Sequence, residues 1–317
     1  MNEKEILSKY IKPLSYNFED SLGLNDDAAM LKNFKDKNFV VSTDNFIYGV
    51  HCPKSLDIKY AIIRAILVAV SDLSAMASNP YCIFLSLTIP KNVDKTFLTK
   101  MKKGISKALA LTNTHLAGGD ICSSRGSISM SVTVIGTANK GKILKRNGAS
   151  GGELLCVTGN IGDAKIGLDL ILQKKVSAEK FLKNYFIRKF ILPEIRYKFS
   201  NNILDYATSC IDLSDGLLTD VYNLAKNSLC GLTIFYEKIP FSKEAKKMLK
   251  NNLYTKKILY NSGDDYELAF SVKEDNLKIV KKIAKRLKVK FSVIGKFEIE
   301  KEINIDMKIN NTGYSHF

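Results

Sequence analysis

Aspartates recur in short polar segments of this chain, often beside apolar runs that are typical of β-strands. The segment Cys210–Asp220 reads Cys-Ile-Asp-Leu-Ser-Asp-Gly-Leu-Leu-Thr-Asp. We interpret it as a short strand that turns into a helix, with Ser214 or Asp215 at the N-cap. Because a helix start offers free N–H groups and the positive end of the helix dipole, this segment suits a phosphate group. Two aspartates beside an anion site also fit a divalent cation between them.

Similar acidic segments appear in both halves of the sequence. Neighbouring carboxylates repel one another, so a cluster of them needs compensating cations. Oxygen ligands from several segments suit Mg²⁺, which shares its coordination with substrate phosphates. Phosphoryl transfer fits such a site because its catalysis is mostly positioning and charge neutralisation. The acids are Asp26, Asp27, Asp44, Asp72, Asp120, Asp212, Asp215, Asp264 and Asp265.

The hydrophobic pattern of the first half places its acids at strand ends, in a helix and in a loop. Phe39–Asp44 is a predicted strand that ends in Ser-Thr-Asp, and Asp57–Ser78 is a long apolar helix that contains Asp72. A carboxylate on such a helix either faces water near the helix end or is held by a metal or a donor. Ala117–Asp120 is a predicted loop, whose glycines let a ligand approach the backbone.

The second half begins with a predicted strand, Glu153–Thr158, and a glycine-containing turn that enters a helix. This is a weak phosphate-binding signal, because it matches neither G-x-G-x-x-G nor the Walker A pattern. The turn Asn261–Glu267 adds Asp264 and Asp265 just before another strand.

The length of 317 residues makes two domains the default expectation. Residues 139–152 are rich in glycine and charge, so we predict a linker there. The predicted N-terminal domain is 1–138 and the C-terminal domain is 153–317.

Composition argues against several classes of function. The net charge is +16, but lysines are spread along the chain, and the densest basic stretch, Lys282–Lys290, has the apolar period of a helix. We therefore expect no nucleic-acid partner. The apolar runs are too short to cross a membrane and the first residues are polar, which predicts a cytoplasmic protein. The six cysteines form no C-x-x-C pair, so we expect them to be reduced.

Together the motifs resemble the thiamine-monophosphate kinase family, in the superfamily of aminoimidazole-ribotide synthetase-like ATP-dependent enzymes. They span nearly the whole chain in the order of the family, and their joint presence is specific. The resembling segments are 25–29, 42–51, 70–80, 118–120, 146–149, 157–164, 211–217, 262–268 and the Gly-Tyr-Ser-His-Phe end.

The resemblance implies a two-domain α+β fold of the aminoimidazole-ribotide synthetase type, each domain a mixed or antiparallel sheet with helices packed on it. It implies Mg²⁺-dependent transfer of the ATP γ-phosphate directly to thiamine monophosphate, giving thiamine diphosphate and ADP. Several Mg²⁺ ions and ATP as co-substrate are expected. A homodimer is also implied, in which the N-terminal domains pair through their sheets. The C-terminal domain is expected to complete the nucleotide and substrate site.

The resemblance also assigns roles to residues. No covalent nucleophile is expected, and developing charge would be stabilised by Asp44, Asp72, Asp120, Asp212 and Asp215. ATP would contact Gly119, Asp120, Arg146 and Ser214, and thiamine monophosphate would meet His51, Asp264 and Tyr314. The implied Mg²⁺ ligands are Asp27, Ser42, Thr43, Asp44, Asp72, Asp120, Asp212 and Asp215.

The chain departs from the family pattern at two of these motifs. Asn25 stands where the family usually has glycine before Asp-Asp, and Asp264 stands where glutamate is usual, which shortens that contact by one methylene.

Two relatives within the superfamily fit less well. A selenophosphate synthetase would have a reactive cysteine in an early glycine-rich loop, where this chain has Ser21-Leu22-Gly23. A hydrogenase-maturation protein would have a C-terminal cysteine, where this chain has His316-Phe317. A basic nucleic-acid-binding module is the non-enzyme alternative; it predicts salt-sensitive binding that does not depend on Mg²⁺.

Overall fold

The fold is that of a computed structural model, which describes residues 3–26, 28–173 and 180–299. The described residues divide into two compact units, one within 1–73 and 79–141 and the other within 74–78 and 142–317. The short piece 74–78 groups with the second unit although it lies between the two segments of the first unit in the sequence. None of the helices in these ranges combines the length and the apolar character needed to cross a membrane.

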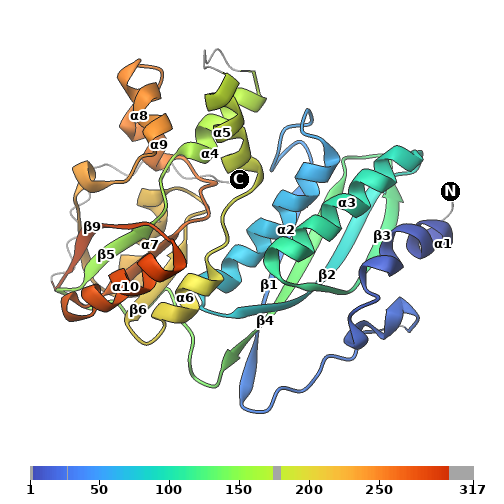
Figure 1. The fold of residues 1–317 in the computed structure, drawn as a ribbon, viewed down its shortest axis with the longest axis horizontal. Coiled ribbons are helices and arrows are strands. Elements are labelled where there is room, and N and C mark those ends of the chain that lie inside the picture. The colour runs from blue at the N-terminus through green and yellow to red at the C-terminus, as the bar shows by residue number, and fades with distance from the viewer. Residues whose placement is uncertain (1–2, 27, 174–179, 300–317) are drawn as a thin grey trace. The chain divides into compact units, whose positions relative to one another are not determined.

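The first unit contains a four-stranded mixed sheet with helices on one face (Figure 1). Its order is β1-β4-β2-β3; β4 is antiparallel to both neighbours, whereas β2 and β3 are parallel. The elements of this unit begin with α1 (Glu3–Ile6), β1 (Lys37–Ile47) and α2 (Ile58–Ala75), followed by β2 (Asn79–Pro90), α3 (Lys95–Thr112), β3 (His115–Ser124) and β4 (Ser129–Asn139).

Alternation along β1 separates a buried face from an open one. Val40 and Phe46 are buried, while Phe39, Val41 and Ile47 are 44%, 59% and 38% exposed. Because successive side chains of a strand point to opposite faces, the inward set packs toward the helices and the outward set stays uncovered in this unit.

The second unit contains a five-stranded antiparallel sheet of order β6-β8-β5-β9-β7. Its strands are β5 (Leu154–Thr158), β6 (Ala207–Asp212), β7 (Gly231–Ile234), β8 (Leu268–Val272) and β9 (Phe291–Glu298). Its helices are α4 (Asp163–Ile171), α5 (Lys180–Ile191), α6 (Tyr197–Ile203), α7 (Leu217–Asn227), α8 (Lys243–Lys250), α9 (Lys256–Asn261) and α10 (Leu277–Leu287).

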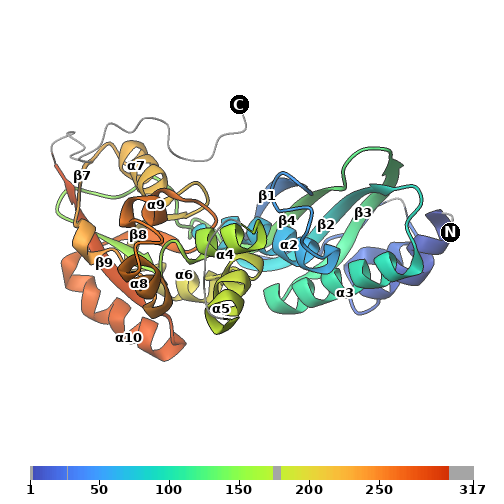
Figure 2. The same ribbon diagram turned by 90° about the horizontal axis from the view of Figure 1, so that it is seen from above.

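Both faces of the second sheet are covered, which makes this unit three-layered. Leu155 and Val157 join a core with α4, α5, α7, α8 and α9. Cys156, between them in β5, joins a second core with α6 and α10 on the opposite face. Figure 2 shows α10 lying along this sheet. Strands buried on both faces explain the nearly continuous apolar runs in this half of the sequence.

The predicted fold class is confirmed, because both units combine mixed or antiparallel sheets with packed helices. The prediction of a loop at Ala117–Asp120 is wrong, since these residues lie inside β3. Their glycines allow close strand packing: a Cβ on Gly119, whose φ is +148°, would lie 2.1 Å from the Leu85 carbonyl oxygen. Glycine here serves the contact between β2 and β3.

Candidate active site

Ser42 and Asp44 share one face of β1, where Asp72 of α2 meets them. The Ser42 hydroxyl donates a hydrogen bond of 2.5 Å to Asp72 Oδ2. The strand continues to Ile47, so Asp44 lies within β1, and the predicted strand end at this acid is wrong. The Asp72 carboxylate is held by a donor, which is one of the two situations expected for an acid on an apolar helix.

The electrostatic environment of Asp44 is unfavourable for its charge. Burial, and after it the charge of Asp72, raises the pKa of the Asp44 carboxyl from 3.8 to about 6. Two carboxylates that repel each other in a partly buried setting form a ready partner for a divalent cation, which would lower the free energy of both charged forms.

Thr43 and Asp120 project from the opposite face of this sheet. The Thr43 hydroxyl lies 2.9 Å from the hydroxyl of Thr133. Asp120 is in register with Ser86, which is in register with Ser131 and thus with Asn45. Because paired residues point to the same face, Asp120 and Thr43 lie on the side away from Ser42 and Asp44. The predicted ligands of this unit are therefore divided between two faces.

His51 lies in the loop after β1, where one nitrogen of its ring contacts the strand backbone. Its Nδ1 accepts a hydrogen bond of 2.8 Å from the Ile47 backbone N–H. A neutral imidazole with Nδ1 as acceptor carries its proton on Nε2, which makes Nε2–H a donor. The same loop supplies Tyr48 and Lys54 to a cavity of about 430 Å³ that Arg125 also lines.

In the second unit, β6 ends at Asp212 and α7 begins at Leu217. The predicted change from strand to helix is therefore confirmed. The prediction of Ser214 or Asp215 as N-cap is wrong, because the cap position is Gly216 at φ +127° and no side chain caps the helix there.

The helix start is instead stabilised from within α7 by Asp220. Its Oδ2 accepts hydrogen bonds from the backbone N–H groups of Asp215 and Gly216, at 3.1 and 3.2 Å. Burial, followed by the charges of Asp215 and Asp212, raises the pKa of Asp220 to about 8. Three carboxylates therefore influence one another around this turn.

The acidic turn 261–267 lies against the segment 213–216. Backbone hydrogen bonds join Tyr266 N–H to the Leu213 carbonyl and Asp264 N–H to the Ser214 carbonyl, at 2.8 and 2.9 Å. A Cβ on Gly263 would lie 2.1 Å from that Ser214 oxygen, so only glycine fits there. Asp264 and Ser214, assigned by resemblance to the substrate and to ATP, are thus neighbours.

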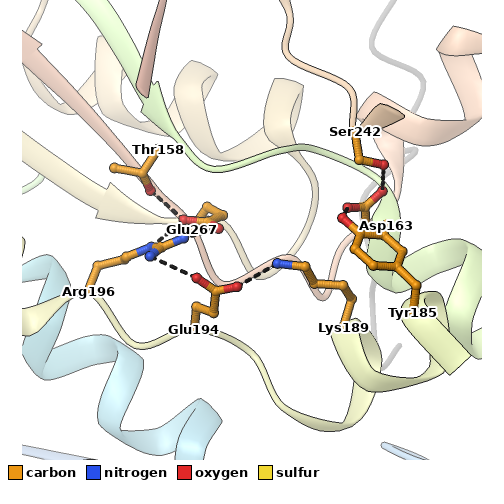
Figure 3. Close-up of polar contacts among 8 residues, drawn as sticks. All are labelled: Thr158, Asp163, Tyr185, Lys189, Glu194, Arg196, Ser242 and Glu267. Carbon is orange, nitrogen blue, oxygen red and sulfur yellow. Dashed lines mark hydrogen bonds and ion pairs between the residues drawn. The ribbon is translucent and has the colours of Figure 1, made fainter. Parts of the chain in front are cut away.

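A buried ionic network anchors the end of this turn (Figure 3). The guanidinium of Arg196 donates two hydrogen bonds of 2.7 Å to the carboxylate of Glu267, and the Thr158 hydroxyl donates a third at 2.6 Å. Arg196 also pairs with Glu194 at 3.0 Å. Arg196 and Glu267 are both nearly buried, so their bidentate pair fixes the position of the chain just before β8.

Three other assigned residues complete the survey. The side chain of Arg146 is exposed, and its carbonyl oxygen accepts a hydrogen bond of 3.4 Å from the Ser228 hydroxyl after α7. Asp27 and Tyr314 lie outside the described residues.

Comparison with known proteins decides the family. Residues 25–138 match the N-terminal domain of AIR synthase related proteins and residues 133–308 match the C-terminal domain. The thiamine-monophosphate kinase of Buchnera aphidicola subsp. Schizaphis graminum is 33% identical, over 100% of this chain and 99% of the relative. This chain belongs to the thiamine-monophosphate kinase family.

Solved structures of this family share the fold. Thiamine-monophosphate kinase from Stenotrophomonas maltophilia K279a has a TM-score of 0.85 at 26% identity, covering 94% of this chain and 95% of that one. AaThiL complexed with AMPPCP and TMP has a TM-score of 0.79 at 27% identity, covering 99% and 94%.

The residues of the first unit fit the Mg²⁺ that the thiamine-monophosphate kinase family leads us to expect. Asp44, Asp72 and Ser42 offer oxygen atoms only, the donors that Mg²⁺ prefers. No group of three or more His, Cys, Asp or Glu side chains converges as a metal site within the described ranges. A pair of carboxylates suits Mg²⁺ bound together with substrate phosphates.

The sequence interpretation missed several residues that shape these sites. Asp220 could have been recognised as an acid in the first turn of a helix that follows an acidic loop. Asp265 was predicted as one of the clustered acids, but its contact with the backbone was not: its two carboxylate oxygens accept from Gly162 N–H, at 3.0 and 2.8 Å. Nothing local marked Arg196, because its partner Glu267 is 71 residues away.

Proposed function

We propose that this chain binds ATP through Mg²⁺ and transfers the γ-phosphate to thiamine monophosphate. Membership of the family makes the chain an ATP-dependent kinase that forms thiamine diphosphate and ADP. An oxygen of the acceptor phosphate forms the new bond to the γ-phosphorus, and the bond from that phosphorus to the bridging oxygen breaks. AMPPCP, the ligand of AaThiL, is an ATP analogue with carbon at this bridge, which supports the assignment.

The observation that carries the proposal is the Ser42–Asp72 hydrogen bond beside Asp44. It brings the Asp72 carboxylate of α2 to the face of β1 that carries Ser42 and Asp44, where the three side chains can receive a cation. Bound Mg²⁺ supplies neutralisation of the phosphate charge that develops during transfer. Asp44 and Asp72 would hold that ion as charged ligands, and Ser42 would add a hydroxyl oxygen.

The second unit supplies its own ligands in this proposal. Asp212 and Asp215 would bind Mg²⁺, and Ser214 would contact ATP. Asp220 would hold the backbone of their turn through its two N–H contacts. The remaining assigned nucleotide and metal residues stay predictions; they are Asp27, Thr43, Gly119, Asp120 and Arg146.

Thiamine monophosphate would be bound by His51, Asp264 and Tyr314. The Nε2–H of His51 is a suitable donor to a phosphate oxygen or a ring nitrogen. The cavity beside its loop, with Lys54 and Arg125, provides positive charge for an anionic group. The carboxylate of Asp264 is a suitable partner for the aminopyrimidine or the cationic thiazolium.

A homodimer is part of the proposal, through the open face of the first sheet. Phe39, Val41 and Ile47 are exposed apolar residues on this face, which also carries Thr43 and Asp120, and their exposure supports a protein contact there. Light scattering of the full chain measures its oligomeric state directly. A Val41→Glu variant should be a monomer. A cytoplasmic location and the absence of a nucleic-acid partner stay predictions.

The activity itself is tested by incubating the full chain with ATP, MgCl₂ and thiamine monophosphate. We expect equimolar thiamine diphosphate and ADP by chromatography, and no product when EDTA is added. Free thiamine as acceptor tests whether the phosphate of the substrate is required. If no thiamine diphosphate forms even at high enzyme concentration, the assignment is wrong.

A further inference from the structure

A second cavity, of about 550 Å³, lies in the first unit between the helical turn Leu7–Ile11 and α3. This volume is in the range of sites that hold small organic ligands. Its ionisable lining is basic: the lysines are Lys9, Lys102, Lys103 and Lys107, and no carboxylate of the described residues lines it. None of these residues has been assigned to ATP, Mg²⁺ or thiamine monophosphate.

The sequence of α3 concentrates this charge. The helix Lys95–Thr112 contains five lysines and no aspartate or glutamate. Lys100 does not line the cavity and pairs with Asp57 at 2.7 Å. Lys103 and Lys107, four residues apart, lie on the cavity side, where like charges at this spacing destabilise a helix. The cavity side therefore carries repulsion that a bound anion would relieve.

The facing segment increases the charge and adds other contacts. Lys102 Nζ donates a hydrogen bond of 3.3 Å to the Lys9 carbonyl oxygen, which brings the Lys102 ammonium group next to the segment that carries Lys9. Tyr10 supplies an aromatic ring, and Thr99 and Ser106 supply hydroxyl groups. Ammonium groups bind phosphate as point charges, hydroxyls donate hydrogen bonds to phosphate oxygens, and the ring can cover an organic moiety.

We propose that this cavity is a separate binding site for a small oligophosphate, such as an inorganic polyphosphate or a nucleotide. A concave site with a single aromatic ring favours a small molecule over single-stranded nucleic acid, which stacks successive bases on several aromatic side chains. The site does not depend on the proposed kinase activity. Its ligand is recognised by the number and closeness of its negative charges.

Chemical footprinting with inorganic tripolyphosphate locates the site directly. The full chain is acetylated with a lysine-specific reagent in EDTA, with and without tripolyphosphate, and the modified lysines are quantified by peptide mass spectrometry. We expect acetylation of Lys102, Lys103 and Lys107 to slow by about fivefold or more when the site is largely occupied. Lys246 and Lys247, exposed on α8, serve as internal controls and should react at unchanged rates.

A matched pair of variants tests whether these lysines hold the ligand. Lys103→Gln/Lys107→Gln and Lys246→Gln/Lys247→Gln remove the same charge from exposed helix positions. Calorimetry with tripolyphosphate, without Mg²⁺, should show at least about a tenfold weaker affinity for the first variant only. Equal weakening in both variants, or none in the first, overturns the proposal. Protection by a 20-nucleotide RNA but not by tripolyphosphate also overturns it, in favour of a nucleic-acid surface.

Discussion

The backbone N–H of Asp264 donates a hydrogen bond of 2.9 Å to the carbonyl oxygen of Ser214. These residues belong to separate motifs, one assigned to thiamine monophosphate and the other to ATP. Since the bond joins backbone atoms, replacing Asp264 by the family's usual glutamate changes the reach of the side chain and leaves this contact in place. In the proposed site, this backbone contact would link the residue assigned to the acceptor with the residue assigned to ATP through one turn.

Asp44→Asn should abolish the kinase reaction while stabilising the protein without metal. The folded-state pKa of about 6 lies above the ordinary value of 3.8, so the wild type loses stability as the pH rises through this interval. At pH 7 in EDTA the free energy of unfolding of the variant should be about 1 kcal/mol higher than that of the wild type. This is less than the full pKa shift corresponds to, because the Asp44 side chain is partly exposed. Urea denaturation measures this, with the exposed Asp36→Asn as control.

Addition of Mg²⁺ with AMPPCP should reverse that order. Ligand binding stabilises the wild type in proportion to ln(1 + [L]/Kd), and the variant lacks one charged ligand for the cation. Equal stabilisation of both proteins by Mg²⁺ and AMPPCP would remove Asp44 from the metal site.

His51→Ala should weaken the binding of thiamine monophosphate rather than the binding of ATP. Loss of the Nε2–H donor to an ionised group removes about 1.5–3 kcal/mol of binding, so the KM for thiamine monophosphate should rise by about tenfold or more. The KM for ATP should change by less than about twofold. The control is His115→Ala, which removes a ring stacked on Phe18 at 4.7 Å and should leave both KM values unchanged. A rise confined to the KM for ATP contradicts the assignment.

Arg196→Gln should be strongly destabilising. It leaves the Glu267 carboxylate buried without its bidentate partner, which costs about 3–5 kcal/mol. The matched control is Lys142→Gln, whose partner Asp205 is 70% exposed, and it should cost less than about 1 kcal/mol. Equilibrium unfolding in urea compares the two. Similar small losses of unfolding free energy in both variants would show that the network in Figure 3 contributes little stability.

Asp220→Asn should become increasingly favourable as the pH rises. Burial and the charges of Asp215 and Asp212 raise the pKa of Asp220 to about 8, so the wild type loses stability between about pH 4 and 8, where the unfolded chain ionises this carboxyl and the folded protein keeps its proton. The asparagine oxygen can still accept from the N–H groups of Asp215 and Gly216. Relative to the wild type in EDTA, the variant should gain at least about 2 kcal/mol between pH 5 and 8.

Thermal or urea unfolding at a series of pH values measures that difference. Asp205→Asn, at an exposed site, provides the control and should give a flat difference across the series. A flat difference for Asp220→Asn would mean that this carboxylate is not in the repulsive environment described here.

The sequence by itself determined the features that local chemistry encodes. A short apolar run located β5, and a long apolar stretch located α2, because elements buried in a core need apolar residues at most of their positions. The motif set indicated the family, because the motifs follow one another in the family's order along nearly the whole chain despite the departures at Asn25 and Asp264, and the similarity to known relatives confirms it. The strand-to-helix change after Asp212 was also readable, because a strand pattern there gives way to a helix pattern.

Tertiary structure alone decided which of these residues meet. Gly118–Asp120 looked like a loop, yet pairing with β2 draws them into a strand, where the glycines permit close contact. The start of α7 is stabilised by the carboxylate of Asp220 rather than by the predicted caps Ser214 or Asp215. Arg196 pairs with Glu267, which is 71 residues away in the sequence. The separation of Thr43 and Asp120 from Asp44 also depends on strand register. Such contacts arise from packing between distant segments, which no local pattern records.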